Sequence, residues 1–190
     1  MYNWKNDIDE CLFTLNRGGI ILYPTDTVWG IGCDATNENT VSRIFSLKNR
    51  PDEKSMIILL ADEKDIPKYI SQANPKIFDY IKGIHKPTTV IYEDAMGLAK
   101  NLINKDGSIA IRIVKDEFCK KLISSFGKPI VSTSANLSGY PAPANFNDID
   151  IAIKMAVDYV VQYRQDDLTE ALPSTIVKLN ADGSIIILRP

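Results

Sequence analysis

The sequence is poor in the side chains that build metal centres and disulfide frameworks. Among 190 residues it has one histidine, His85, so a histidine-rich metal centre is excluded and a Ser-His-Asp triad would depend on this residue. Its cysteines, Cys11, Cys33 and Cys119, are odd in number and form no Cys-x-x-Cys pair. This argues against a disulfide framework or a zinc site and is typical of reduced thiols in the cytoplasm, where we expect the protein.

Long apolar runs and glycine-rich nucleotide motifs are also missing. The longest apolar runs, such as MIILLA, are far too short to span a bilayer, and the amino terminus is polar and acidic rather than a signal peptide. We therefore expect no membrane association. Neither Gly-x-x-x-x-Gly-Lys-Ser/Thr nor Gly-x-Gly-x-x-Gly occurs, so a nucleotide would be held without a P-loop or a Rossmann turn. The net charge of −2 argues against a protein that coats nucleic acid with its whole surface.

The composition is that of a soluble globular protein, with 45% apolar and 24% charged residues, and the length suits one domain over residues 1–190. Helical and β-type spacing of apolar residues alternate along the chain. We expect helices over 4–16, 38–47, 66–70, 76–81 and 116–126, and a further helical stretch before 159. We expect strands over 20–23, 56–60, 88–92, 108–114, 130–132, 174–179 and 184–189. This order predicts an α/β fold with a twisted, mixed β-sheet flanked by helices and a hairpin at the end.

Small polar side chains follow the first predicted strand at Thr25, Asp26 and Thr27. Residues of this kind commonly close an ST-turn or an Asx-turn, and the alternative is a ligand site. A second group, Lys48, Arg50 and Lys54, follows a predicted helix. Cations there complement the helix dipole, and the alternative is that they grip a polyphosphate.

Arg112 interrupts an apolar strand, IAIRIVK. The three isoleucines of this strand share one face and Arg112 lies on the other. If that face is solvated, Arg112 carries no information; if it is covered, Arg112 lines a cavity and needs an anionic partner, because an unpaired buried guanidinium costs several kcal/mol.

A dense group of hydroxyls follows the strand that starts at residue 130, in the stretch PIVSTSANLSGYPAP. It is either a plain polar loop or a loop whose hydroxyls and amide groups surround phosphates. The four polar groups together predict one pocket that positions phosphates and neutralises their charge without a histidine base.

These stretches, in this order and spacing, resemble the YrdC domain family, the threonylcarbamoyl-AMP synthases. The motifs that carry the resemblance are YPTDTVWGIGCDA, LKNRP, IAIRI, STSANLSG, PSTIV and the final ILRP. The resemblance runs from about residue 18 to 190 and implies a short, single-domain form whose sheet surrounds a basic concave cavity.

The resemblance implies a reaction of L-threonine, bicarbonate and ATP. Threonine and bicarbonate give N-carboxy-threonine, whose carboxylate attacks the α-phosphate of ATP to form threonylcarbamoyl-adenylate and pyrophosphate. Mg²⁺ accompanies the ATP, and no metal site made of protein groups alone is expected. Partner threonylcarbamoyl transferase proteins then modify the adenosine beside the anticodon of tRNA.

The resemblance also assigns site residues one at a time. Arg112 would pair with the substrate carboxylate, and Thr25 and Asp26 would hold the turn that presents Thr27. The catalytic residues would be Lys48 and Arg50. ATP would be bound by Arg50, Lys54, Ser108, Ser134, Asn136, Ala142 and Arg189. Threonine would be bound by Thr27, Arg112, Ser132 and Ser174.

Three places depart from the family pattern. His85-Lys86-Pro87 replaces a Pro-Gly-Pro-x-Thr loop, Leu59 stands where some members have a histidine that contacts the amino acid, and the glycines that often precede Pro173-Ser174 are missing.

Two alternatives remain open from the sequence. One is a non-synthase relative that binds tRNA or double-stranded RNA, which would favour exposed aromatic residues near the basic motif, such as Tyr23; we expect Trp29 to lie in the core. The other is a carbamoyltransferase subdomain with a different substrate. Retention of Lys48, Arg50 and the Ser-x-Asn motif favours the synthase.

Overall fold

The computed structural model describes residues 4–49, 56–71, 77, 80–81, 83–179 and 184–190. A single nine-stranded mixed sheet organises these residues, in the order β7-β1-β2-β6-β3-β5-β4-β8-β9. The strands are β1 (Ile21–Tyr23), β2 (Gly30–Gly32), β3 (Ile57–Leu60), β4 (Thr88–Tyr92), β5 (Ile109–Ile113), β6 (Ile130–Ser134), β7 (Tyr159–Val160), β8 (Thr175–Leu179) and β9 (Ile185–Arg189). The predicted fold class, a mixed sheet flanked by helices, is confirmed.

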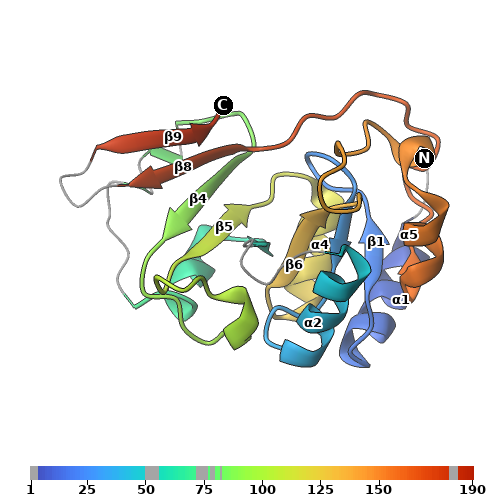
Figure 1. The fold of residues 1–190 in the computed structure, drawn as a ribbon, viewed down its shortest axis with the longest axis horizontal. Helices are drawn as coiled ribbons and strands as arrows, with labels where there is room; N and C mark the ends of the chain where they lie inside the picture. Colours follow the sequence, from blue (N-terminus) through green and yellow to red (C-terminus); the bar gives the residue numbers. More distant parts are fainter. Residues whose placement is uncertain (1–3, 50–55, 72–76, 78–79, 82, 180–183) are drawn as a thin grey trace.

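The four labelled helices gather around one half of the sheet, beside β1 and β6, while β8 and β9 extend away from them at the other end (Figure 1). They are α1 (Lys5–Asn16), α2 (Glu38–Leu47), α4 (Glu117–Phe126) and α5 (Ile151–Ala156), and three short 3-10 helices, η1 (Glu63–Lys68), η2 (Lys100–Leu102) and η3 (Phe146–Asp148), lie in the connections. Helices α1 and α4 pack together, with the Trp4 and Phe118 rings edge to face at 6.0 Å.

Local sequence explains where the main helices begin and end. The Asn37 side chain accepts hydrogen bonds from the backbone N–H groups of Asn39 and Thr40 and so caps α2. Asp116 caps α4 in the same way, and α4 ends at Gly127, whose φ of 73° a glycine adopts without strain. Both helices match their predicted ranges to within one residue.

Strand β2 was not expected from the sequence. It lies between β1 and β6, and a Cβ on Gly32 would come within 2.5 Å of the Val131 carbonyl oxygen and 2.7 Å of Tyr23 Cε1. Only glycine allows this approach, so the second glycine of GIG is required by packing rather than by a ligand. Trp29 is buried and packs on Phe146 with ring centroids 4.8 Å apart, which confirms its place in the core.

Cys11, Cys33 and Cys119 are buried and free, and burial raises the pKa of each thiol. They therefore behave as small apolar core groups rather than as reactive thiols. Among the helices of the described ranges, none combines the length and the apolar character that crossing a bilayer needs. Arg50, Lys54, the turn at 180–183 and much of the helix expected over 76–81 lie outside the described residues.

Candidate functional site

A cavity of about 710 Å³ opens on one face of the sheet, within the size range of small-molecule sites. Strand register explains its floor. Ile57 of β3 pairs with Ser132 of β6 and with Ala110 of β5, and Ala110 pairs with Ile91 of β4. Paired residues in adjacent strands point to the same face, so these four side chains form one row across the floor.

A second row of the same face lies two residues along each strand. It runs from Leu59 to Arg112, Thr89, Ile176 and Arg189, each paired with the next. Arg112 and Arg189 both line the cavity, so the alternation of β-strands places two guanidinium groups above one floor. Leu59 is fully buried beside Arg112, where it offers only apolar contact.

The structure answers the question that the sequence left open for Arg112. Its side chain is 3% exposed and its NH2 atom lies 3.2 Å from Asp26 Oδ1, whose side chain is 7% exposed. Arg112 NH2 also donates to Thr25 Oγ1 at 3.4 Å, while its Nε has no hydrogen-bond partner among the described residues. Arg112 is therefore a cavity residue that is held by a buried carboxylate and keeps one donor unused.

The Thr25–Thr27 segment is both a closed turn and a wall of the cavity. Thr25 Oγ1 lies 3.0 Å from Thr27 Oγ1, accepts the Thr27 N–H at 3.0 Å and donates to the Val28 carbonyl at 2.9 Å. Asp26 Oδ2 accepts the Lys115 N–H at 3.1 Å, which fixes the other side of the turn. Thr27 lines the cavity, so this ST-turn forms part of the cavity wall.

Ser174 and Arg189 form the opposite wall. Ser174 Oγ lies 2.7 Å from Thr89 Oγ1, and Arg189 donates from Nε and NH2 to the Ser174 carbonyl at 3.0 and 2.8 Å. The pKa of Arg189 is lowered, first by partial burial and then by the positive charge of Arg112. Two cations that repel each other across a cavity favour an anion between them.

Lys48 does not line the cavity. It is 1% exposed, and its Nζ donates to the carbonyl oxygens of Ser134 and, at 2.6 Å, of Asn136. Its own carbonyl accepts the Ser138 N–H at 2.9 Å. The predicted catalytic role of Lys48 stays a prediction, while its contacts show a lysine that holds the 134–138 loop in place.

Asn136 continues this loop, because its Nδ2 donates to the carbonyl oxygens of Leu137 at 2.9 Å and Tyr140 at 2.6 Å. Ser108, predicted to contact nucleotide, is not a lining residue. Its hydroxyl donates to Asp106 Oδ1 at 2.6 Å and accepts from Asn104 Nδ2 at 2.9 Å. This hydroxyl stabilises the loop before β5, and a nucleotide contact there stays a prediction.

The cavity brings together most of the predicted site residues that the structure describes. Its lining includes Thr27, Arg112, Ser132, Ser134, Asn136, Ala142, Ser174 and Arg189. The predicted Arg50 and Lys54 lie outside the described residues. Sequence reasoning missed Tyr140 and the apolar floor at Met56, Ile57, Ile91 and Ile176, although period-two alternation from Ser132 and Arg112 could have indicated Ile57 once the strand order was known.

The lining carries no carboxylate among the described residues, and no group of three or more His, Cys, Asp or Glu side chains there could hold a metal ion. Cations, hydroxyls and backbone amides can bind and orient anions, and the apolar floor can hold a small side chain or a base.

A model of the Sua5–YciO–YrdC family, described as "Telomere recombination", matches residues 14–190. The threonylcarbamoyl-AMP synthase of Photobacterium profundum is 36% identical over 142 residues, which are 72% of this chain and 75% of that protein. The threonylcarbamoyl-AMP synthase of Pseudoalteromonas translucida is 32% identical over 175 residues, 90% of this chain and 92% of that one.

Among solved structures, P. abyssi Sua5 complexed with L-threonine matches with a TM-score of 0.87 over 100% of this chain, at 22% identity. This likeness shows a common fold. The match covers 55% of the Sua5 chain, so the present chain spans about half of its length.

Proposed function

The chain belongs to the Sua5–YciO–YrdC family, as its motifs predicted, and from this premise we propose that it is a threonylcarbamoyl-AMP synthase. The reaction joins L-threonine, bicarbonate and ATP and gives threonylcarbamoyl-adenylate and pyrophosphate. The observation that carries the proposal is the convergence, in one cavity, of Thr27, Arg112, Ser132 and Ser174 with Ser134 and Arg189.

The threonine half of the cavity lies over the second row of the floor. Arg112 supplies positive charge for the threonine carboxylate, and Thr27 and Ser174 supply hydroxyls, while Arg189 serves the nucleotide. Arg112 is already held by Asp26, so its direction is set before the substrate arrives. This preorganisation lowers the cost of ordering the site at the moment of reaction.

The nucleotide half lies along the loop after β6, where Ser134, Asn136 and Ala142 line the cavity. The amine of threonine adds to bicarbonate with loss of water to give a carbamate. A carbamate oxygen then bonds to the α-phosphorus, and the bond from that phosphorus to the pyrophosphate oxygen breaks. A carbamate is already a nucleophile, so the protein's part is to align it with the phosphorus and to neutralise charge, without a general base.

Mg²⁺ would reach the site with ATP and neutralise phosphate charge there. The donor set agrees with this, because the described lining offers hydroxyls and no carboxylate cage, and Mg²⁺ commonly binds through substrate phosphates. The proposal also includes a cytoplasmic location and transfer of the product to tRNA by partner threonylcarbamoyl transferase proteins. Tyr23 and Trp29 are buried, so they offer no stacking surface for the RNA-binding alternative.

The proposal is tested by measuring pyrophosphate release from ATP by the purified chain, with detection of the adenylate by mass spectrometry. We expect release that requires both L-threonine and bicarbonate, with threonylcarbamoyl-adenylate present. Release without the adenylate, or no release while ATP still binds, would overturn the proposal and make RNA binding the next measurement.

Thr27→Ala should raise the KM for L-threonine about tenfold and leave the KM for ATP within about twofold, because the lost hydroxyl faces the amino-acid half of the cavity. Thr27 Oγ1 also contacts Thr25 Oγ1, so Thr27→Ser, which keeps the hydroxyl, is the matched control and should resemble the wild type. An equal rise in both KM values would contradict the assignment of Thr27 to threonine.

A further inference from the structure

A second arginine contacts the Thr25–Thr27 turn from outside the main cavity. Arg164 NH1 donates to the Thr25 carbonyl oxygen at 3.1 Å, across 139 residues of sequence. Arg164 does not line the main cavity; it lines a small recess on the other side of the turn, together with Pro24, Thr25 and Thr27. The turn is therefore held by Arg112 on one side and by Arg164 on the other.

The backbone of Arg164 adopts a conformation that is unfavourable for arginine. Its φ is +66°, in the left-handed region, which glycine and asparagine adopt far more readily than arginine. A residue without such a preference costs about 1 kcal/mol or more there. The contacts of the Arg164 guanidinium offset the free-energy cost of this conformation.

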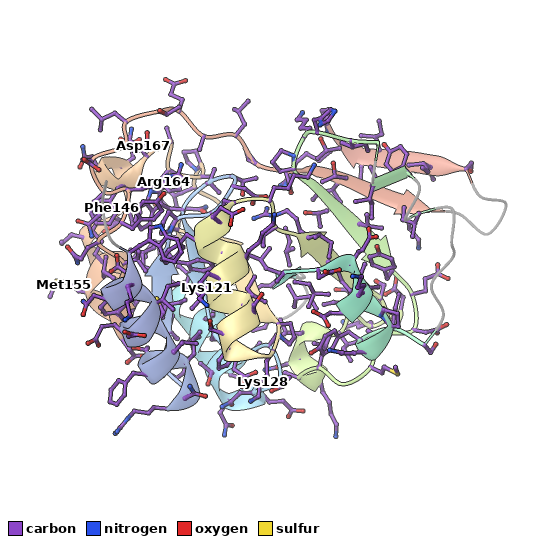
Figure 2. All side chains as sticks on the ribbon, turned by 180° about the vertical axis from the view of Figure 1, so that it is seen from behind. Lys121, Lys128, Phe146, Met155, Arg164 and Asp167 are labelled. Carbon is purple, nitrogen blue, oxygen red and sulfur yellow. The ribbon has the colours of Figure 1, made fainter. Side chains whose placement is uncertain are left out.

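Asp167 holds the guanidinium of Arg164. Asp167 Oδ2 lies 3.1 Å from both Nε and NH2 of Arg164, and Asp167 Oδ1 accepts the Thr169 N–H at 3.0 Å. The hydrogen bonds from Thr169, and then Arg164, lower the pKa of Asp167, so the carboxylate stays charged at neutral pH. Both side chains are about one third exposed, and they lie at the edge of the molecule above Phe146 (Figure 2).

We infer that Arg164 is a positioning residue for the amino-acid half of the cavity, an inference that rests on the proposed synthase function. Thr25 connects the two sides: its carbonyl accepts from Arg164, and its Oγ1 contacts Thr27 and Arg112. Release of the carbonyl frees the peptide that carries these contacts. The Thr25 hydroxyl, which contacts both Thr27 and Arg112, is then no longer held in place, so these two residues lose their fixed relative position. Arg164 itself touches no substrate.

Arg164→Gly removes the guanidinium but retains the backbone conformation, because glycine adopts a φ of +66° without strain. The variant therefore reports on the side-chain contacts alone. We expect the KM for L-threonine to rise about tenfold, with the KM for ATP within about twofold of the wild type. Arg164→Lys, which keeps one charged donor, should recover part of the loss. Asp167→Asn should give a smaller rise, because the guanidinium stays but is less firmly held.

Arg43 provides a matched control elsewhere on the molecule. Its NH1 donates to the Gly18 carbonyl at 3.0 Å and its NH2 lies 2.9 Å from Asp158 Oδ2. Like Arg164, Arg43 thus binds one backbone carbonyl and one aspartate. Arg43 lines neither the cavity nor the recess. Arg43→Gln should therefore lower the melting temperature slightly and leave both KM values unchanged.

The inference is overturned if Arg164→Gly leaves the KM for threonine unchanged, or raises both KM values together as general loosening would. Calorimetric titration of L-threonine into the same variants separates this inference from the proposed function. Wild-type protein that binds threonine but forms no adenylate would overturn the synthase alone, and the Kd values would then test Arg164. Wild-type protein that binds no threonine would overturn both.

Discussion

Replacement of Arg112 by methionine is expected to abolish threonine binding and to lower the free energy of unfolding by about 3–5 kcal/mol. The stability loss has a specific cause: Asp26, whose side chain is 7% exposed, would remain buried without its cation. The loss of threonine binding has a different cause: the Arg112 guanidinium is the only buried cation on the cavity floor in the described part of the chain. Urea denaturation and calorimetric titration of L-threonine measure the two effects.

A double variant separates these effects. Arg112→Met combined with Asp26→Asn removes both charges, while the asparagine oxygen can still accept the Lys115 N–H. We expect most of the lost stability to return and threonine binding to stay absent. A stable single variant would contradict the buried ion pair, and a double variant that binds threonine would contradict the role of Arg112.

Lys48→Met should reduce the synthase rate about a hundredfold, an effect expected when a site is displaced by about 1 Å. Methionine fills the space of the lysine stem but removes the ammonium donor; the Ser134 carbonyl oxygen keeps the Asn136 N–H at 2.9 Å, while the Asn136 carbonyl oxygen loses its donor. The unsatisfied Asn136 carbonyl costs about 1–3 kcal/mol, so the loop should move to find another partner for it. Amide hydrogen exchange across 134–140 should become faster in the variant.

This measurement also tests the predicted catalytic role of Lys48. If the ammonium acts on phosphates directly, the rate should fall without a change in hydrogen exchange at the loop. Lys121→Met, an exposed lysine of α4 on the face seen in Figure 2, is the control and should change neither the rate nor the exchange.

Local signals in the sequence were sufficient for most elements. The helices expected over 38–47 and 116–126 are present as α2 and α4, and β4 has its predicted bounds, Thr88–Tyr92. β2 was missed because its three residues are mostly glycine, so no apolar alternation marks it. Its strand character depends on neighbours, β1 and β6, that are far apart in the sequence.

For the site, the motifs identified residues and the structure decided their partners. Thr27, Ser132, Ser174 and Arg189, which the resemblance assigned to the ligands, line the cavity. The sequence could not show that Lys48 turns its ammonium to the loop, because the donor and its first acceptor are 86 residues apart.

By itself, then, the sequence determined the α/β class, the boundaries of α1, α2 and α4 to within one residue, and the family, because periodicity and motifs act over a few residues. The helix expected over 66–70 is wrong in type and bounds, since the structure has the 3-10 helix η1, Glu63–Lys68, there. Only the tertiary structure decided that Asp26 neutralises Arg112 and that Arg164 holds the Thr25 carbonyl. The physical reason is the strand order: β7, which precedes Arg164, pairs with β1, which precedes Thr25, and β5, which carries Arg112, belongs to the same sheet, although these strands are far apart in the chain. Charged groups and carbonyl oxygens in such a sheet contact residues that are far apart in the sequence, and local sequence patterns do not predict these contacts.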